Sequence, residues 1–174
     1  GYEPKIAQAT LQNGEVTVLD VALRPLATYS ISAKAVSSLT GAGVPDARMI
    51  ISNAEYVFEA GADDDRNVAI ADVFEGTYDI TVGAWGYFHK VVENVSLDND
   101  RSLTISLEEG YQDDFLFDLG WRSRTDTATA GFWERGVPVA STFSSMLATP
   151  TADIPDDLGG SCYVTSNRGG QAGA

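Results

Sequence analysis

The feature that most constrains the fold is a two-residue alternation of apolar and polar side chains, which recurs along much of the chain. It is clearest where Leu103, Ile105 and Leu107 alternate with Ser and Thr, and the same rhythm runs through residues 19–23 and 78–82. A period of two is typical of a β-strand with one buried face, and helical periodicity is nearly absent. The pattern predicts an all-β protein of short strands, arranged as a β-sandwich.

Turn residues separate these strands. Asn13-Gly14 is the strongest hairpin signal, because both residue types tolerate the positive φ of a type I′ turn. Two further turns are expected at residues 41–43, Gly-Ala-Gly, and at residues 63–67, Asp-Asp-Asp-Arg-Asn.

An internal repeat links the first residues of the chain to a later segment. Gly1-Tyr2 returns as Gly86-Tyr87. Further matches follow at nearly the same spacing, with Lys5, Leu11, Asn13 and Leu23 echoed by Lys90, Leu97, Asn99 and Leu107. The second copy closes a domain that begins near Thr28, so the first copy is predicted to be the closing hairpin of a preceding module.

The charge of the chain restricts its partners. Lys and Arg number 11 against 25 Asp and Glu, a net charge of −14. Nucleic acids and anionic membrane surfaces are bound through clustered Lys and Arg, so the composition argues against both. No apolar run reaches the ~18 residues of a transmembrane helix, so we expect no membrane insertion.

Several features fit a secreted chain. It begins at Gly1 without Met and lacks the basic-then-apolar start of a signal peptide, so we expect a mature product or a fragment. Asn94 begins an N-x-S sequon. Thr127 lies in a short Asp-Thr-Ala sequence that resembles the O-glycosylation signal of Bacteroidetes. Both are candidate glycosylation sites, with an unmodified side chain as the alternative.

Catalytic motifs are missing. His89 is the only histidine, whereas a zinc peptidase needs several ligands, and a Ser or Cys nucleophile needs a positioned base. Cys162 is the only cysteine, so an internal disulfide is excluded, and we expect a small buried apolar side chain. The sequence therefore predicts that the chain is no enzyme, and that His89 is a strand residue.

Three large aromatic residues, Trp121, Phe132 and Trp133, have two interpretations. Their flat rings could stack on sugars as a carbohydrate platform. Large aromatic residues of a sandwich are more often part of the core, which is the interpretation we favour.

Residues 28–108 carry an ordered series of motifs. They are Tyr29-Ser30-Ile31-Ser32, Gly43-Val44-Pro45-Asp46-Ala47, Met49-Ile50-Ile51, Val68-Ala69-Ile70, Gly76-Thr77-Tyr78 and Gly86-Tyr87. In this order they resemble the carboxypeptidase regulatory-like (transthyretin-like) domain, a seven-stranded sandwich common in secreted bacterial proteins. The sequence departs from the family at Ala33, where Gly is usual, and at Arg66-Asn67, which replaces the usual Asn-Gly turn.

After residue 108 the composition shifts to aromatic and acidic motifs. They are Asp113-Asp114-Phe115, Gly120-Trp121, Phe132-Trp133-Glu134 and Ser161-Cys162-Tyr163. They resemble the opening of a jelly-roll-like module that follows regulatory-like domains in secreted peptidases and adhesins of Bacteroidetes.

Carboxylates provide two candidates for Ca²⁺, which prefers hard oxygen ligands. Residues 63–65 lack the D-x-D-x-D-G spacing and are interpreted as a solvated hairpin tip. Asp113, Asp114 and Glu134 are the second candidate, because sandwiches of the kind that the chain resembles often hold a calcium near the start of the module. No other cofactor is expected.

These features predict an immunoglobulin/transthyretin-like β-sandwich followed by a partial second β-sandwich module. The expected boundaries are a terminal hairpin over 1–26, a regulatory-like sandwich over 27–109 and the start of a jelly-roll-like module over 110–174.

The expected function is that of a non-catalytic extracellular structural module. It would self-assemble into a filament or surface appendage by intermolecular β-strand pairing, with a second copy or a neighbouring β module as partner. Two alternatives stay open: an accessory domain of a secreted metallocarboxypeptidase or other hydrolase, and a carbohydrate-binding module that recognises glycans through its aromatic residues.

Overall fold

The computed structural model describes residues 1–123 and 131–171, and every regular element in them is a β-strand. The chain divides into two compact units, Gly1–Val82 with His89–Leu107 and Gly83–Phe88 with Glu108–Ala174. The described residues contain no helix of the length and hydropathy that crossing a membrane requires.

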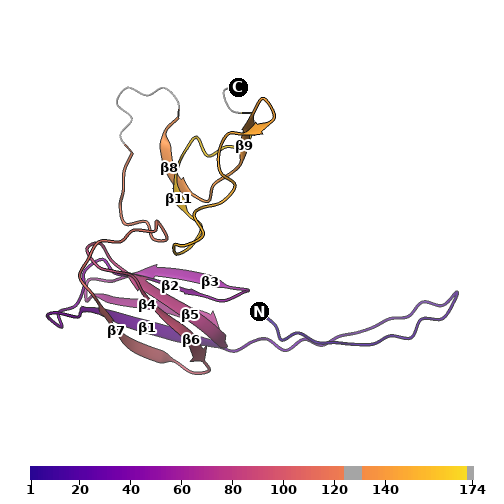
Figure 1. Ribbon diagram of the computed structural model, residues 1–174. Coiled ribbons are helices and arrows are strands. Elements are labelled where there is room, and N and C mark those ends of the chain that lie inside the picture. Colours follow the sequence, from indigo (N-terminus) through magenta and orange to yellow (C-terminus); the bar gives the residue numbers. More distant parts are fainter. Residues whose placement is uncertain (124–130, 172–174) are drawn as a thin grey trace. The chain divides into compact units, whose positions relative to one another are not determined.

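Seven strands build the first unit (Figure 1). They are β1 (Thr28–Ser37), β2 (Arg48–Ser52), β3 (Val57–Gly61), β4 (Asn67–Phe74), β5 (Gly76–Gly83), β6 (Lys90–Leu97) and β7 (Arg101–Leu107). The strands form two sheets, in the orders β4-β1-β7 and β3-β2-β5-β6. In the first sheet β1 is central, antiparallel to β4 and parallel to β7. The all-β sandwich predicted from the alternation is confirmed.

The core of the first unit consists of the alternating residues that the sequence pattern singles out. On β7, Ile105 and Leu107 are buried, while the polar residues that alternate with them are exposed. On β5 the three buried residues of 78–82 are at most 3% exposed. The hydroxyl of Tyr78 donates a hydrogen bond to the carbonyl of Phe74 (2.9 Å), so the ring is buried with its polar atom satisfied. Burial raises the pKa of the Tyr78 phenol.

The two predicted turns of the first unit are confirmed. Asp63 Oδ1 accepts a hydrogen bond from the amide of Asn67 (2.8 Å), and the amide of Arg66 donates to the carbonyl of Asp63 (2.9 Å). Arg66 has a φ of 64° and thus supplies the left-handed conformation of the β3–β4 turn. Gly41, beyond the end of β1, has a φ of 70°, which glycine adopts without strain.

The last two strands of the first unit lie in different sheets. β6 pairs antiparallel with β5, whereas β7 pairs parallel with β1. Residues 98–100 therefore carry the chain from one sheet to the other. At this corner Asp100 Oδ1 accepts a hydrogen bond from the amide of Ser30 on β1 (2.8 Å). The second copy of the sequence repeat thus closes the first unit through a corner between its two sheets.

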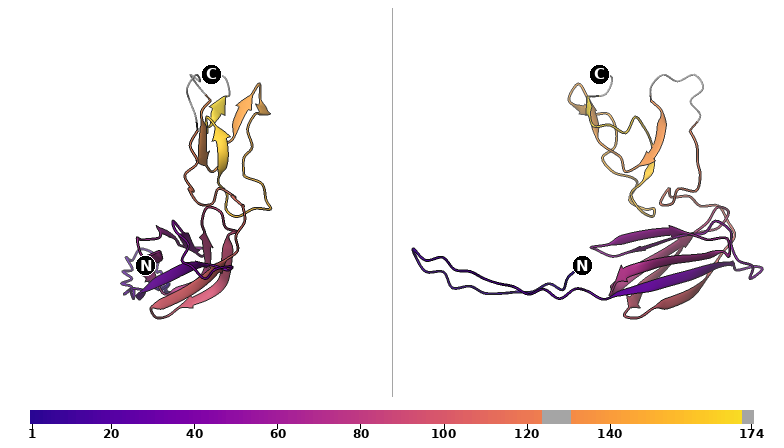
Figure 2. Two further views of the ribbon diagram at one scale, coloured as in Figure 1. Left: turned by 90° about the vertical axis from the view of Figure 1, so that its left-hand side faces the viewer. Right: turned by 180° about the vertical axis from the view of Figure 1, so that it is seen from behind.

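Residues 1–26, called the arm below, form two extended segments that run side by side (Figures 1 and 2). The segments meet in an isolated antiparallel bridge between Tyr2 and Pro25. Residues 4–23 form no strand, so the strand predicted at residues 19–23 is absent.

The turn of the arm lies at Asn13-Gly14, as predicted, and the amide of Glu15 donates to the carbonyl of Gln12 across it (3.3 Å). Of its two central residues only Gly14 has a positive φ, 82°. A type I′ turn needs a positive φ at both, so the predicted turn type is wrong. Hairpin turns outside the primed types splay the two chain segments, which agrees with the missing ladder.

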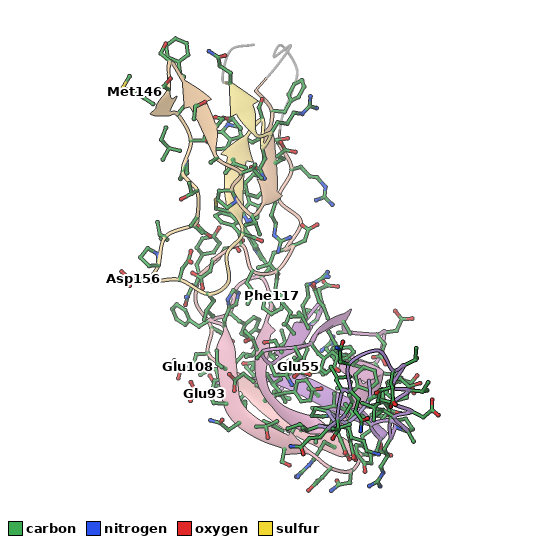
Figure 3. The ribbon with its side chains drawn as sticks, turned by 90° about the vertical axis from the view of Figure 1, so that its right-hand side faces the viewer. Glu55, Glu93, Glu108, Phe117, Met146 and Asp156 are labelled. Carbon is green, nitrogen blue, oxygen red and sulfur yellow. The ribbon has the colours of Figure 1, made fainter. Side chains whose placement is uncertain are left out.

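The second unit has shorter strands. They are β8 (Trp133–Gly136), β9 (Ser141–Phe143), β10 (Met146–Leu147), β11 (Cys162–Thr165) and β12 (Gly170–Gln171). β8 pairs antiparallel with β11, and β9 lies between β10 and β12. Phe117 is 1% exposed and forms part of a small core, whereas Met146 on β10 is 69% exposed (Figure 3). The guanidinium of Arg135 on β8 donates to the carbonyls of Phe115 and Leu116, which fixes the segment beside Phe117.

Candidate interaction sites

The base of the arm is held by a short antiparallel pairing, called the clasp below, between residues 1–3 and 24–26. The amide of Glu3 donates to the carbonyl of Arg24 (2.8 Å). The amide of Leu26 donates to the carbonyl of Gly1 (3.1 Å). An exposed ion pair between Arg24 and Glu3 (3.5 Å) adds little, because water screens it. The clasp therefore rests on its backbone hydrogen bonds.

Beyond the clasp the two segments keep one register but make few hydrogen bonds. Lys5 Nζ donates to the carbonyl of Ala22 (3.1 Å), and Thr17 Oγ1 donates to the carbonyl of Thr10 (3.3 Å). Both pairs are placed symmetrically about the Asn13-Gly14 turn, as is the clasp. The two segments of the arm are therefore paired in one register, but only a few hydrogen bonds hold them together.

The apolar side chains of the arm face solvent. Ile6 is 95% exposed and Leu11 is 82% exposed. Five more large apolar residues are exposed on the returning segment: Val16, Val18, Leu19, Val21 and Leu23. An exposed apolar surface of this extent is unusual for a soluble protein and commonly marks an interaction site.

The second unit has an aromatic pocket, a cavity of about 290 Å³ lined by Phe115, Trp121, Arg122, Ser123, Trp133 and Tyr163. The rings of Phe115 and Tyr163 meet edge to face with their centroids 5.2 Å apart. Trp121 Nε1 donates a hydrogen bond to Asp113 Oδ2 (2.6 Å), and the hydroxyl of Tyr163 donates to the carbonyl of Trp121 (3.1 Å). These contacts fix the orientation of the rings.

The three aromatic residues singled out in the sequence are exposed. Trp121 and Phe132 are each 43% exposed, and Trp133 is 57% exposed. The prediction that they belong to a core is therefore wrong. The second unit buries few of its large side chains, so its rings stay in contact with solvent.

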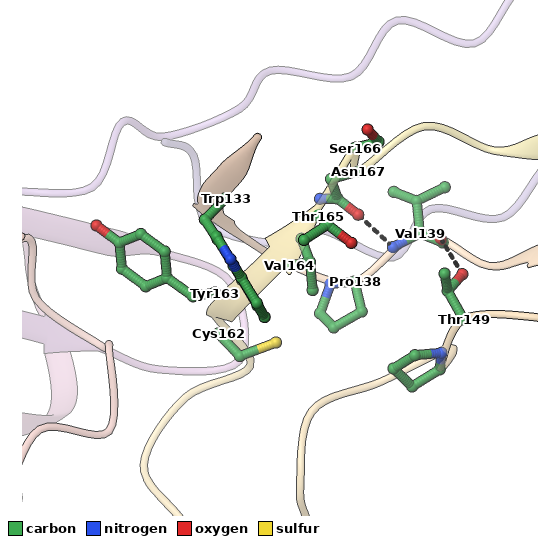
Figure 4. Close-up of a pocket in the computed structure, with 11 residues that line it drawn as sticks. Trp133, Pro138, Val139, Thr149, Cys162, Tyr163, Val164, Thr165, Ser166 and Asn167 are labelled. Atoms are coloured by element: carbon green, nitrogen blue, oxygen red, sulfur yellow. Dashed lines mark hydrogen bonds between the residues drawn. The ribbon is translucent and has the colours of Figure 1, made fainter. Parts of the chain in front are cut away.

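Trp133 also borders a second cavity, of about 230 Å³, with Pro138, Cys162 and Tyr163 among its lining residues (Figure 4). Cys162 is half-buried, in partial agreement with the expected buried side chain. Burial raises the pKa of the Cys162 thiol, and the nearby Asp153 carboxylate raises it further. A raised pKa favours the neutral thiol, whereas nucleophilic cysteines carry a lowered pKa.

Polar groups beside this second cavity are already engaged. Asn167 Oδ1 accepts from the amide of Val139 (2.8 Å), and Asn167 Nδ2 donates to the carbonyl of Val137 (2.7 Å). Thr149 Oγ1 donates to the carbonyl of Val139 (3.2 Å; Figure 4). Asn167 and Thr149 therefore fix the backbone of residues 137–139 in the wall of this cavity.

The predicted calcium ligands are separately engaged. Asp113 Oδ1 accepts from the amide of Phe115 (2.9 Å), Asp114 Oδ2 from Gln112 Nε2 (2.9 Å) and Glu134 Oε1 from the amide of Asn167 (2.6 Å). Within residues 1–123 and 131–171 no three His, Cys, Asp or Glu side chains form a group that could hold a metal, at this set or at residues 63–65.

Three further predicted positions fall outside these sites. His89 is half-buried and immediately precedes β6. The prediction that it is a strand residue is therefore wrong. Asn94 is exposed on β6 with a φ of 57°, and its amide donates to Asp79 Oδ1 (2.8 Å). Thr127 lies outside the described residues.

Sequence reasoning missed two parts of these sites. Phe115 and Tyr163 lie beside Trp121 through the fold, and no spacing in the sequence marks the three as neighbours. The clasp was also missed, although the Gly-Tyr repeat was a signal for it.

No model of a known protein family matches the chain, and no curated protein matches it significantly. The resemblance to the carboxypeptidase regulatory-like domain and to a jelly-roll-like module therefore stays a prediction, while the sandwich that it implied is present in the first unit.

Several solved structures show a weak similarity to about half of the chain. A protein from Bacteroides uniformis assigned to carbohydrate binding is 15% identical with a TM-score of 0.40, over 45% of this chain and 40% of that chain. The major pilin subunit BcpA of Bacillus cereus is 12% identical with a TM-score of 0.39, over 51% of this chain and 31% of that one. A cohesin–X-dockerin complex from Acetivibrio cellulolyticus gives 23% identity and a TM-score of 0.37, over 47% and 58%. The chain thus spans less than two thirds of each of these proteins.

Proposed function

We propose that this chain is a non-catalytic extracellular structural module that assembles with a neighbouring β module by β-strand pairing through its arm. Where the neighbour is another copy, repetition of the contact builds a filament or surface appendage.

The exposed apolar arm is the observation that carries the proposal. Residues 4–23 form no strand, so most of their backbone donors and acceptors face solvent. Unpaired extended backbone beside exposed apolar side chains is a template for pairing with another sheet. A partner sheet would cover the side chains and satisfy the backbone in one step.

The contact proposed is head-to-tail, because the arm of one molecule meets a different surface on the next. Heterologous contacts of this kind give rings when the rotation closes and filaments when it does not. Size-exclusion chromatography and negative-stain microscopy distinguish the two.

Deleting residues 1–26 is expected to abolish assembly while the first unit stays folded, because β1 to β7 and their core lie outside the arm. Leu11→Asp is expected to weaken assembly without deleting any backbone. The matched control is Leu39→Asp, which places the same charge on a side chain that is 78% exposed outside the arm. Assembly that survives the deletion, or that Leu39→Asp weakens equally, contradicts the proposal.

A second candidate function is glycan binding at the aromatic pocket, which the exposure of Trp121 and Trp133 favours. Trp133→Ala is then expected to remove a change in tryptophan fluorescence on titration with oligosaccharides. Phe143→Ala is the control, because Phe143 is an exposed aromatic residue of the same unit that does not line the aromatic pocket. A fluorescence response that Trp133→Ala leaves intact excludes this pocket as the glycan site.

A further inference from the structure

The sequence repeat is also a structural repeat. The bridge between Tyr2 and Pro25 has its counterpart between Tyr87 and Glu109. The two hydrogen bonds of the clasp return as well, with the amide of Phe88 donating to the carbonyl of Glu108 (2.9 Å) and that of Gly110 to the carbonyl of Gly86 (3.0 Å). The chain thus makes the same clasp twice, at matching positions of the repeat.

The two chain segments beyond the second clasp separate. One becomes β6 at the edge of the four-stranded sheet, and the other becomes β7 in the three-stranded sheet. Their apolar side chains close the core of the sandwich: Leu97 and Leu107 are each 1% exposed and Ile105 is 5% exposed.

The segments beyond the first clasp carry equivalent residues in a different environment. Leu11 matches Leu97 and is 82% exposed, and Leu23 matches Leu107 and is 51% exposed. Val21, which matches Ile105 in the same register as the Leu23 pair, is 39% exposed. The arm therefore has the apolar pattern of β6 and β7 without a core to complete.

We infer that the arm occupies the β6 and β7 positions of a second sandwich built like the first unit, one that supplies the equivalents of β1 to β5 but lacks its own β6 and β7. Residues 5–11 add antiparallel beside the partner's β5 equivalent, and residues 17–23 add parallel to its β1 equivalent. The inference rests on the proposed function and names the partner. The partner is therefore a separate β module and not a second copy of this chain, because a copy's β6 and β7 positions are filled by its own strands.

The pairing register of β1 with β7 in the first unit predicts which partner residue lies opposite each residue of the arm. Lys34 on β1 lies opposite Thr104 on β7, and Asp20 is the arm residue that matches Thr104. In the partner, Asp20 would therefore lie opposite the equivalent of Lys34, an opposite-charge pair between neighbouring strands.

Little holds the arm closed against this separation. Beyond the clasp, the hydrogen bonds between its segments are two from side chains and the one across the turn. The clasp itself need not open, because the second clasp persists while β6 and β7 lie in different sheets.

The test uses two versions of the full chain, co-expressed, both with Cys162→Ser. The donor carries Asp20→Cys on an intact arm. The acceptor carries Lys34→Cys and has residues 90–107 replaced by a Gly/Ser linker of equal length, which empties the β6 and β7 positions. The acceptor's own arm is disabled by Val21→Asp and Leu23→Asp.

A disulfide-linked heterodimer of donor and acceptor is expected, because paired residues on neighbouring strands lie within disulfide reach. The link is expected to be lost when the donor also carries Val21→Asp and Leu23→Asp. A parallel acceptor with Glu59→Cys on the edge strand β3, in place of Lys34→Cys, is expected to give no link.

The outcomes separate the two proposals. Co-elution of donor and acceptor without the Asp20→Cys to Lys34→Cys link, or linking through Glu59→Cys, overturns the inference and leaves strand pairing by the arm in place. No association in either combination overturns both.

A chimeric chain tests the inference independently of whether the acceptor folds. In the full chain, residues 5–23 replace residues 90–107 and are expected to restore a cooperative thermal transition of the first unit, whereas a scrambled insert of equal composition is not. A chimera without that transition overturns the inference, because the arm then cannot form β6 and β7.

Discussion

Tyr78 shows how a single side chain combines packing with hydrogen bonding in the first unit. Its ring is 3% exposed, and its hydroxyl donates to the carbonyl of Phe74. Asp63 and Asp64 show the opposite case, since both are exposed in the β3–β4 turn and only Asp63 accepts the hydrogen bond from Asn67 that closes it. Asp63 and Asp64 are adjacent aspartates, yet only Asp63 makes a hydrogen bond that stabilises the turn.

Tyr78→Ala is expected to lower the free energy of unfolding by about 3–5 kcal/mol, the usual range for deleting a buried large aromatic side chain. Asp64→Ala is expected to leave it nearly unchanged, because the side chain is exposed in the turn. Urea unfolding of the two variants and the wild type measures both effects. A loss below ~1 kcal/mol for Tyr78→Ala contradicts the burial of the ring.

At the scale of elements, the sequence predicted the strands of the first unit well and the arm poorly. Residues 103–107 and residues 19–23 carry the same alternation, yet only the first set forms a strand. Alternation indicates which face of a segment can be buried, but it carries no information on whether a sheet is present to bury it. The corner at residues 98–100 was missed for a related reason, because its Asp-Asn-Asp sequence suits a hairpin turn as well as a crossing between sheets.

The corner between β6 and β7 depends on Asp100, whose side chain accepts the hydrogen bond from the amide of Ser30. Asp100→Ala is expected to lower the free energy of unfolding by about 1 kcal/mol, the typical net value of one such bond. Asp100→Asn keeps an acceptor oxygen and is expected to lose less. Hydrogen exchange at the Ser30 amide should become faster in Asp100→Ala and change little in Asp100→Asn. Equal losses in both variants would mean that the hydrogen bond does not stabilise the corner.

At the scale of the whole molecule, the sequence predicted the all-β fold class, but not the exposed aromatic surface of the second unit. Trp121 and Trp133 were expected in a core because large rings are usually buried. Whether a ring is buried depends on the neighbours that the fold brings to it, and in the second unit those neighbours leave both rings exposed.

The parallel pairing of β1 with β7 also bears on how the first unit responds to mechanical load. β1 is the first and β7 the last strand of the first unit, and the start of β1 and the end of β7 lie at opposite limits of one parallel ladder that runs from the Ile31–Arg101 pair to the Ser37–Leu107 pair. Tension along the chain would therefore pull the two strands lengthwise past each other and stress all their hydrogen bonds together, whereas an antiparallel hairpin pulled from its open end yields one bond at a time. Such shear geometry resists stretching, a property that suits a link in a chain of modules.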